Sequence, residues 1–224
     1  MIKKVISCLL ILLLAFSFAG CSTTSTKEVA KDKVISLGKN QGNVYTNDFF
    51  NMTINIPEKW VVATDEEKNA LINKGAEIVA GDDKSKAKQI DLAKLRTVYL
   101  LVISAKGMQV QAVDNPNFMV IAEKLSFFQG VKNGSGYLGE VKKQLKTLSS
   151  TLPYNLDKEV YTEKVGGKDF SVLEATIKSG NVKLTQKYYA CVLNGYALSF
   201  ITTSYEDAGA KSLDGVLKSV TFKK

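Results

Sequence analysis

Three turn signals in the last third of the chain constrain its fold more than any other feature. A Gly-Gly pair at 166–167, a Ser-Gly-Asn triplet at 179–181 and an Asn-Gly pair at 194–195 each separate two runs rich in β-branched and aromatic residues. Short turns of this composition join neighbouring antiparallel strands. The predicted meander has four strands, at 159–165, 168–178, 182–193 and 196–203.

Further strand patterns lie outside this meander. Residues 51–56 alternate between apolar and polar, which predicts a half-buried strand. Residues 97–104 are nearly all apolar and predict a central strand, and 118–126 predict another strand. A short run at 220–222 is expected to close the same sheet. Trp60, the only tryptophan, is interpreted as a core anchor rather than a platform for a ligand.

Two helices are expected between the first strands. Thr64 and Glu67 have the spacing of a capping box, which predicts a helix from there to about residue 75. A second helical stretch covers 76–95, with a break at the Gly-Asp-Asp triplet 81–83. We interpret the two aspartates of that triplet as a helix N-terminus, where carboxylates complement the helix dipole, and not as a metal site.

Two more helices complete the pattern. The helix predicted at 134–150 places four apolar residues on one face, and Ser204 with Asp207 predicts a second capping box before a final helix. In that final helix Leu213, Val216 and Leu217 are expected to point inward. The prediction is therefore an α+β domain at 44–224, with one antiparallel sheet of about six to seven strands and helices packed on both faces.

The first 20 residues have the pattern of a leader. Two lysines precede an apolar run at 5–18, which is shorter than the roughly 20 residues that span a bilayer. The run closes on Ala-Gly-Cys, and this resembles a bacterial lipoprotein signal, in which Cys21 becomes the N-terminus and carries a diacylglycerol. We therefore predict a signal peptide at 1–20, a lipidated tether at 21–43 and attachment to the outer face of the membrane. The alternative is an ordinary secretory signal followed by a chance cysteine.

Composition excludes several chemistries. The chain has no histidine, which removes the commonest general base and zinc ligand. Its formal net charge is +8, yet Arg96 is the only arginine, so we expect no nucleic acid partner. The lysines are interpreted as solvated, with attraction to anionic lipid or wall polymers as the alternative. Once the leader is cleaved and Cys21 is lipidated, Cys191 is left alone and no disulfide can form within the chain.

The remaining motifs are weak. Residues 134–139 match G-x-G-x-x-G, but an antiparallel meander follows them, so Ser135 is interpreted as a helix N-cap and no cofactor is expected. Cys191 lies mid-strand without a histidine to activate it and is interpreted as a buried apolar residue. Asp157 and Glu159 are expected on one face of a strand, a spacing that only weakly indicates glycosidase chemistry.

Two features predict a partner surface. Phe127 and Phe128 leave a strand together, so one of them is expected to be exposed, unless both cap the ends of the core. Lys142, Lys143 and Lys146 are expected on the polar side of the helix at 134–150, either as a basic stripe that binds a partner or as a merely solvated side.

Residues at both ends of the domain resemble the PsbP-like family, which includes an extrinsic photosystem II protein and uncharacterised bacterial lipoproteins. The resemblance implies an antiparallel sheet between helices, and a role in binding or assembly rather than catalysis. The metal- and photosystem-related features of PsbP have no recognisable counterpart in this sequence. The matching residues are Phe50, Ile54, Ile56, Pro57 and Trp60, then Tyr189, Gly195, Tyr196, Phe200, Leu213, Val220 and Phe222.

The leading functional hypothesis is a membrane-anchored, extracytoplasmic lipoprotein that is not an enzyme. It would act as a binding or assembly module for an envelope component, either a protein or an anionic polymer. One alternative is an extracellular hydrolase that uses carboxylates. Another is a lipoprotein that binds a small ligand for a transporter.

Overall fold

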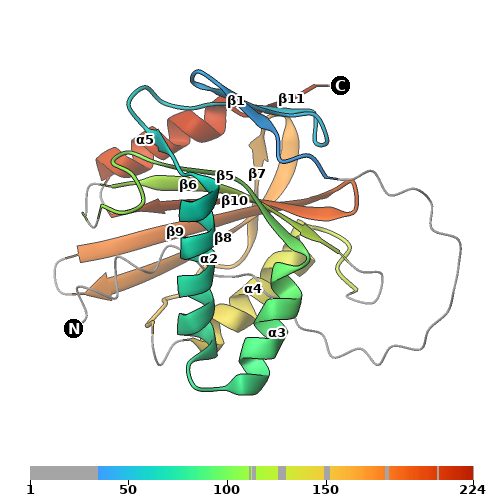
Figure 1. The fold of residues 1–224 in the computed structure, drawn as a ribbon, viewed down its shortest axis with the longest axis vertical. Coiled ribbons are helices and arrows are strands. Elements are labelled where there is room, and N and C mark those ends of the chain that lie inside the picture. Colours follow the sequence, from blue (N-terminus) through green and yellow to red (C-terminus); the bar gives the residue numbers. More distant parts are fainter. Residues whose placement is uncertain are drawn as a thin grey trace, which may run out of the picture.

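The computed structural model describes residues 35–110, 112, 115–125, 130–148, 152–179, 182–205 and 207–223. Seven antiparallel strands form the larger sheet, in the order β4-β5-β6-β10-β9-β8-β7 (Figure 1). Their bounds are Val61–Val62 for β4, Thr97–Ser104 for β5, Asn117–Lys124 for β6, Tyr161–Val165 for β7, Lys168–Ser179 for β8, Val182–Leu193 for β9 and Tyr196–Ser204 for β10.

The smaller sheet has the strand order β1-β2-β3-β11, and its strands are β1 (Lys39–Gln41), β2 (Val44–Asn47), β3 (Met52–Asn55) and β11 (Thr221–Phe222). The predicted closing strand at 220–222 therefore belongs to a different sheet, because β11 pairs with β3. Strand β1 lies inside the range predicted as a tether, 21–43, since it pairs with β2 from Lys39 onward. Paired structure thus begins earlier than residue 44.

The predicted meander is confirmed. Strands β7, β8, β9 and β10 are sequential antiparallel neighbours in the sheet. Asn194 and Gly195 have φ angles of 53° and 79°, the left-handed values that a two-residue hairpin turn of type I′ requires. Local turn chemistry therefore sets the register in which Leu193 faces Tyr196.

Helix α2 (Asp65–Ala80) begins at the predicted capping box: the Glu67 amide donates to Thr64 Oγ1 at 3.2 Å, and the Thr64 amide donates to Glu67 Oε2 at 3.0 Å. It ends five residues later than predicted, because Gly75 is buried inside the helix rather than terminating it. Helix α3 (Lys84–Lys94) is capped by Asp83, which confirms the interpretation of the acidic pair as a helix start.

Two predicted caps are wrong. Helix α4 (Gly134–Thr147) is capped by Asn133, whose Oδ1 accepts from the Gly136 amide at 2.9 Å, so Ser135 lies inside the helix. Helix α5 (Asp207–Ser219) starts later than the predicted box, because Ser204 is still the last residue of β10. Tertiary pairing of β10 with β9 extends to Ser204 and outweighs the local capping pattern.

The larger sheet has one hydrophobic core on each face, which confirms the predicted α+β class with helices on both faces. Helices α2, α3 and α4 cover what we call the α4 face, while α5 and the smaller sheet cover the α5 face (Figure 1). Leu138, Val141 and Leu145 of α4 are fully buried, as predicted, and Trp60 packs half-buried against the core of the α5 face.

Candidate functional site

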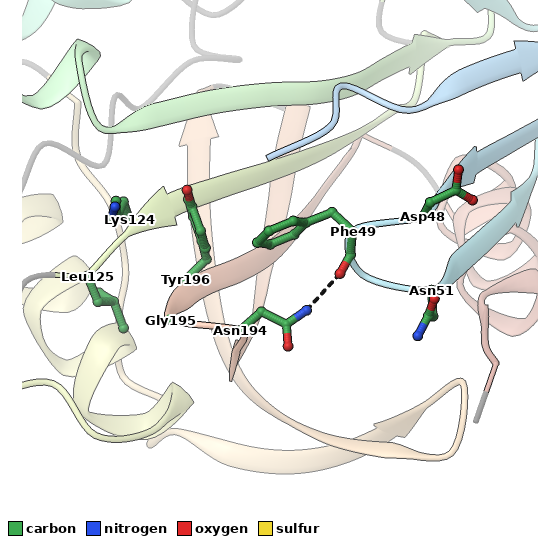
Figure 2. Close-up of a pocket in the computed structure, with 8 residues that line it drawn as sticks. All are labelled: Asp48, Phe49, Asn51, Lys124, Leu125, Asn194, Gly195 and Tyr196. Atoms are coloured by element: carbon green, nitrogen blue, oxygen red, sulfur yellow. Dashed lines mark hydrogen bonds between the residues drawn. The ribbon is translucent and has the colours of Figure 1, made fainter. Parts of the chain in front are cut away.

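A cavity of about 660 Å³ opens at one end of the larger sheet, and we call it the end cavity (Figure 2). It lies where the turn between β2 and β3, the end of β6 and the turn between β9 and β10 meet. The lining residues are Asp48, Phe49, Asn51, Lys124, Leu125, Asn194, Gly195 and Tyr196.

Hydrogen bonds between the turns hold the end cavity in shape. The Asn194 side-chain amide donates to the Phe49 carbonyl at 2.7 Å, which Figure 2 shows as the dashed line. The Leu125 amide donates to the Gly195 carbonyl at 3.0 Å. The ring of Phe49 meets the ring of Tyr196 edge-on, with centroids 5.3 Å apart. The walls are therefore two aromatic rings fixed by backbone contacts, with polar groups around them.

The chain enters the fold beside this cavity. The buried Asn47 side chain donates to the Ser36 carbonyl at 2.8 Å, and its Oδ1 accepts from the Phe50 amide at 3.1 Å. The Tyr45 hydroxyl donates to the Leu37 carbonyl at 2.8 Å, and burial raises the pKa of Tyr45 to about 12. Residues 36 and 37 are thus tied to the same strand end that supplies Phe49 to the cavity.

A second hollow runs along α5 and consists of two adjoining cavities of about 310 and 600 Å³, which share Lys187 and Asp214. We call it the α5 groove. Strands β7, β8, β9 and β10 supply residues on one side of it and α5 supplies residues on the other. Its charged lining residues are Glu163, Glu174, Asp207 and Asp214, together with Lys164, Lys183, Lys187 and Lys218.

Acidic residues of the groove act on the buried hydroxyl of Tyr189. Burial is the main cause that raises the pKa of the Tyr189 hydroxyl well above its usual value, and the negative charges of Glu163, Asp214 and Glu174 add to this effect. Glu174 also forms an ion pair with Lys158 at 2.8 Å. Because lysines and carboxylates occur in equal number, the α5 groove presents both signs of charge rather than one.

The end cavity and the smaller part of the α5 groove, the cavity of about 310 Å³, lie at opposite ends of the sheet. Tyr196, the first residue of β10, lines the end cavity, whereas Thr202 and Ser204, at the end of the same strand, line the α5 groove. A strand rises about 3.3 Å per residue, so these two cavities are separated by roughly 20–25 Å. The point where the chain enters is therefore remote from the smaller part of the groove, whereas the larger part extends to the turn between β7 and β8.

The three lysines of the predicted stripe differ in their surroundings. Lys142 is only 16% exposed and bonds Glu159 and the Lys158 carbonyl, both at 3.2 Å. Lys143 pairs with Glu140 at 2.7 Å, and Lys146 is exposed. None of the three lines the end cavity or the α5 groove. Their role as a partner surface stays a prediction.

The other predicted surface and anchor residues, Phe127, Phe128 and Cys21, lie outside the described residues. Leu125, which lines the end cavity, precedes the phenylalanine pair by two residues in the chain. Within the described part of the chain, no helix is both long enough and apolar enough to cross a membrane.

The residues considered for catalysis, Cys191 and the pair Asp157 and Glu159, do not belong to one common site. Cys191 is buried in β9, as predicted, and burial raises the pKa of its thiol to about 12. Asp157 and Glu159 are exposed and precede β7, so the prediction that they share a strand is wrong. Among the described residues, no group of three or more cysteine, aspartate or glutamate side chains is placed to hold a metal ion.

Sequence reasoning missed both hollows. Their residues come from turns and strands far apart in the chain, and each of them looks like an ordinary turn or surface residue. One usable signal existed: Lys183, Thr185 and Lys187 occupy alternate positions of a long strand, which indicates a second face that is polar.

Comparisons with known proteins address the fold. No protein-family model and no curated protein sequence matches the chain. The solution structure of cyanobacterial PsbP (CyanoP) from Synechocystis superposes with a TM-score of 0.50 at 14% identity, covering 84% of this chain and 99% of that one. The fold is PsbP-like.

Two weaker likenesses accompany it. LpqN, described as involved in cell envelope biogenesis of Mycobacterium tuberculosis, matches with a TM-score of 0.38 at 11% identity, covering 76% of this chain and 82% of that one. A crystal structure from Bacteroides thetaiotaomicron matches with a TM-score of 0.43 at 14% identity, covering 83% of this chain and 50% of that one. At these identities the likeness concerns the fold alone.

Proposed function

We propose that this PsbP-like protein is a lipid-anchored, extracytoplasmic binding module, not an enzyme, and that it holds a segment of an envelope protein in the α5 groove. The observation that supports this most is the placement of the groove. Its smaller part opens at the Ser204 end of β10, while the chain enters the fold at the Tyr196 end. With a lipid on Cys21, the Tyr196 end is the tethered end, and this part of the groove lies at the end away from the tether.

The lining of the groove favours a protein over an anionic polymer. An anionic polymer would meet Glu163, Glu174 and Asp214 as often as it meets lysines, so attraction and repulsion would largely cancel. A polypeptide segment carries both charges and backbone amides. It can pair with the lysines and carboxylates and also bond the hydroxyls of Thr185 and Thr202.

The hydrolase alternative has less support. Glycosidases hold two carboxyl groups about 5–9.5 Å apart around one bond, with one of them kept protonated. Asp157 and Glu159 are exposed and line neither hollow. In the groove, the Glu174 side chain is already engaged in an ion pair with Lys158 at 2.8 Å.

Site-specific photo-crosslinking in intact cells tests the partner. A photoreactive residue at Lys183, exposed on the groove, is expected to capture one envelope protein. The same residue at Lys88, exposed on α3, is the matched control and should capture none. A third probe at Lys146 tests the lysine stripe directly. Capture from Lys88 or Lys146 but not from Lys183 would refute the groove as the binding site.

Metabolic labelling with radioactive palmitate tests the anchor separately. Wild type is expected to take up the label, and Cys21→Ser is expected to lose it, because the thioether forms on that sulfur. Equal labelling of the two proteins would contradict lipidation at Cys21. This result is independent of the crosslinking result, so lipid attachment at Cys21 and partner binding in the α5 groove can be refuted separately.

A further inference from the structure

We infer that the Tyr196 end of the fold docks directly on an anionic bilayer surface, an inference that rests on the proposed lipid anchor. We call the docking region the Leu95 surface. It consists of Phe49, Lys124 and Leu125, which line the end cavity, and of Leu37, Leu95 and Arg96, which lie next to it in the fold.

Backbone hydrogen bonds place these residues next to one another. The Lys124 amide donates to the Arg96 carbonyl at 2.9 Å, which puts the end of α3 beside the end of β6. The Leu125 amide reaches the Gly195 carbonyl at 3.0 Å, and the Asn194 side chain reaches Phe49. The surface therefore extends without a break from the α3–β5 junction to the β2–β3 turn.

Exposed leucines make this surface unusual. Leu95 is 83% exposed and Leu37 is 55% exposed, which makes them two of the four large apolar side chains that are exposed in the described part of the chain. Leu95 follows the last residue of α3, and Leu37 lies where the chain enters. Leucines at such protruding positions are suited to entering the boundary between headgroups and acyl chains.

The charge of the same region is positive. Lys39, Lys94, Arg96 and Lys124 lie on or next to the Leu95 surface, against the two carboxylates of Asp48 and Asp91, and Asp91 pairs with Lys94 at 3.4 Å. Lysine and arginine close to an anionic leaflet are attracted to it over about one Debye length. Protruding leucines surrounded by basic residues suit a bilayer that carries anionic lipid. An apolar protein partner would not require the basic residues.

The length of chain outside the described residues agrees with this orientation. Ile35, the first described residue, is 14 positions after Cys21. Even fully extended, such a chain spans no more than about 50 Å. Since residues 36 and 37 are fixed beside Asn47 and Tyr45, the anchor limits the distance between this end of the fold and the bilayer to about 50 Å. The end cavity, at about 660 Å³, is within the size range of sites for one small molecule and would take an anionic headgroup beside Lys124.

An environment-sensitive dye on the full-length, lipidated protein in vesicles tests the docking. The dye is attached to Leu95→Cys, and the matched control carries it on Lys183→Cys in the α5 groove. Cys191 does not compete for the dye because it is buried. In vesicles of phosphatidylglycerol and phosphatidylcholine, the dye at 95 is expected to shift to shorter wavelength. The shift should be smaller in phosphatidylcholine alone, and the dye at 183 should show none.

Charge reversal provides the second readout. Lys39→Glu with Lys124→Glu is expected to remove at least half of the shift at 95, whereas Lys183→Glu with Lys211→Glu, at the other end of the fold, should leave it unchanged. A dye at Leu37→Cys repeats the measurement if Leu95→Cys fails to fold. An aqueous signal at 95 in protein that floats with the vesicles overturns the docking alone. Protein that does not float with the vesicles overturns the anchor, and the docking with it.

Discussion

Polar side chains are enclosed on one face of the larger sheet and open to solvent on the other. On the α4 face, polar side chains are enclosed: the Tyr137 hydroxyl donates to the fully buried Glu123 at 3.0 Å, and the Tyr154 hydroxyl donates to the buried Gln186 at 3.1 Å. On the α5 face, Lys187 and its polar neighbours remain open in the groove. Because a buried polar group is costly without a partner, these bonded pairs of the α4 face serve the structure, whereas the α5 face leaves its polar groups available for a partner.

The difference follows from how the helices approach the sheet. Helix α4 lies directly on β8 and β9, whereas α5 contacts β10, β6 and β3. Under α5 the core is aromatic, and the rings of Phe170 and Phe200 stack with centroids 4.9 Å apart. Helix α5 and the smaller sheet cover that aromatic part and leave the ends of β8 and β9 uncovered, which creates the groove.

The largest effect is expected where α4 touches the sheet. A Cβ on Gly134 would lie 2.0 Å from the Ala190 carbonyl oxygen, so Gly134→Ala must push the start of α4 away from β9. We expect a loss of about 3 kcal/mol or more in the free energy of unfolding, measured by urea denaturation.

Gly139, in the same helix, is the matched control. No atom lies within 4 Å of a Cβ built there, so Gly139→Ala should stabilise the protein by roughly 0.5–1 kcal/mol through helix propensity. Similar values for the two variants would mean that close approach of α4 does not distinguish the α4 face.

The next effect tests the enclosed polar groups. Tyr137→Phe removes the hydroxyl that donates to Glu123 and should cost about 1–3 kcal/mol of unfolding free energy, because the carboxylate stays buried. Tyr196→Phe, at the end cavity, is the control and should change stability by less than about 0.5 kcal/mol. An equal loss of unfolding free energy in Tyr137→Phe and Tyr196→Phe would contradict the contrast between the two faces.

Sequence could predict what is decided locally. The Asn194–Gly195 turn and the Thr64–Glu67 cap act over two to four residues, and both are present as expected. The last residue of α2 could not be predicted from the sequence, since burial of Gly75 outweighs its low helix propensity. The partner of β11 could not be read either, because a two-residue strand pairs where tertiary packing places it. Both hollows depend on such long-range placement.

Alkaline pH should affect both faces, because each contains buried tyrosines. Burial raises the pKa of Tyr99, Tyr137, Tyr154 and Tyr188 on the α4 face, and of Tyr189 on the α5 face, well above 10, while the half-exposed Tyr161 has its pKa raised to about 12. A raised folded-state pKa gives stability that is complete below the unfolded value near 10 and is lost as pH rises above it. The free energy of unfolding should therefore begin to fall above about pH 8.5, where the Cys191 thiol ionises in the unfolded chain, and fall further above about pH 10. Tyrosinate absorbance should appear together with unfolding; full ionisation in a protein that is still folded would contradict the enclosure.

The smallest effect on stability is expected in the α5 groove. Lys187 is half-buried in an open hollow beside carboxylates, so Lys187→Ala removes only partly screened interactions and should change the free energy of unfolding by less than about 1 kcal/mol. The same substitution should sharply reduce capture of the partner by the probe at Lys183, because it removes a central charge of the groove. A loss of stability as large as that of Tyr137→Phe would mean that the groove residues are structural, and the contrast between an enclosed face and an available face would then fail.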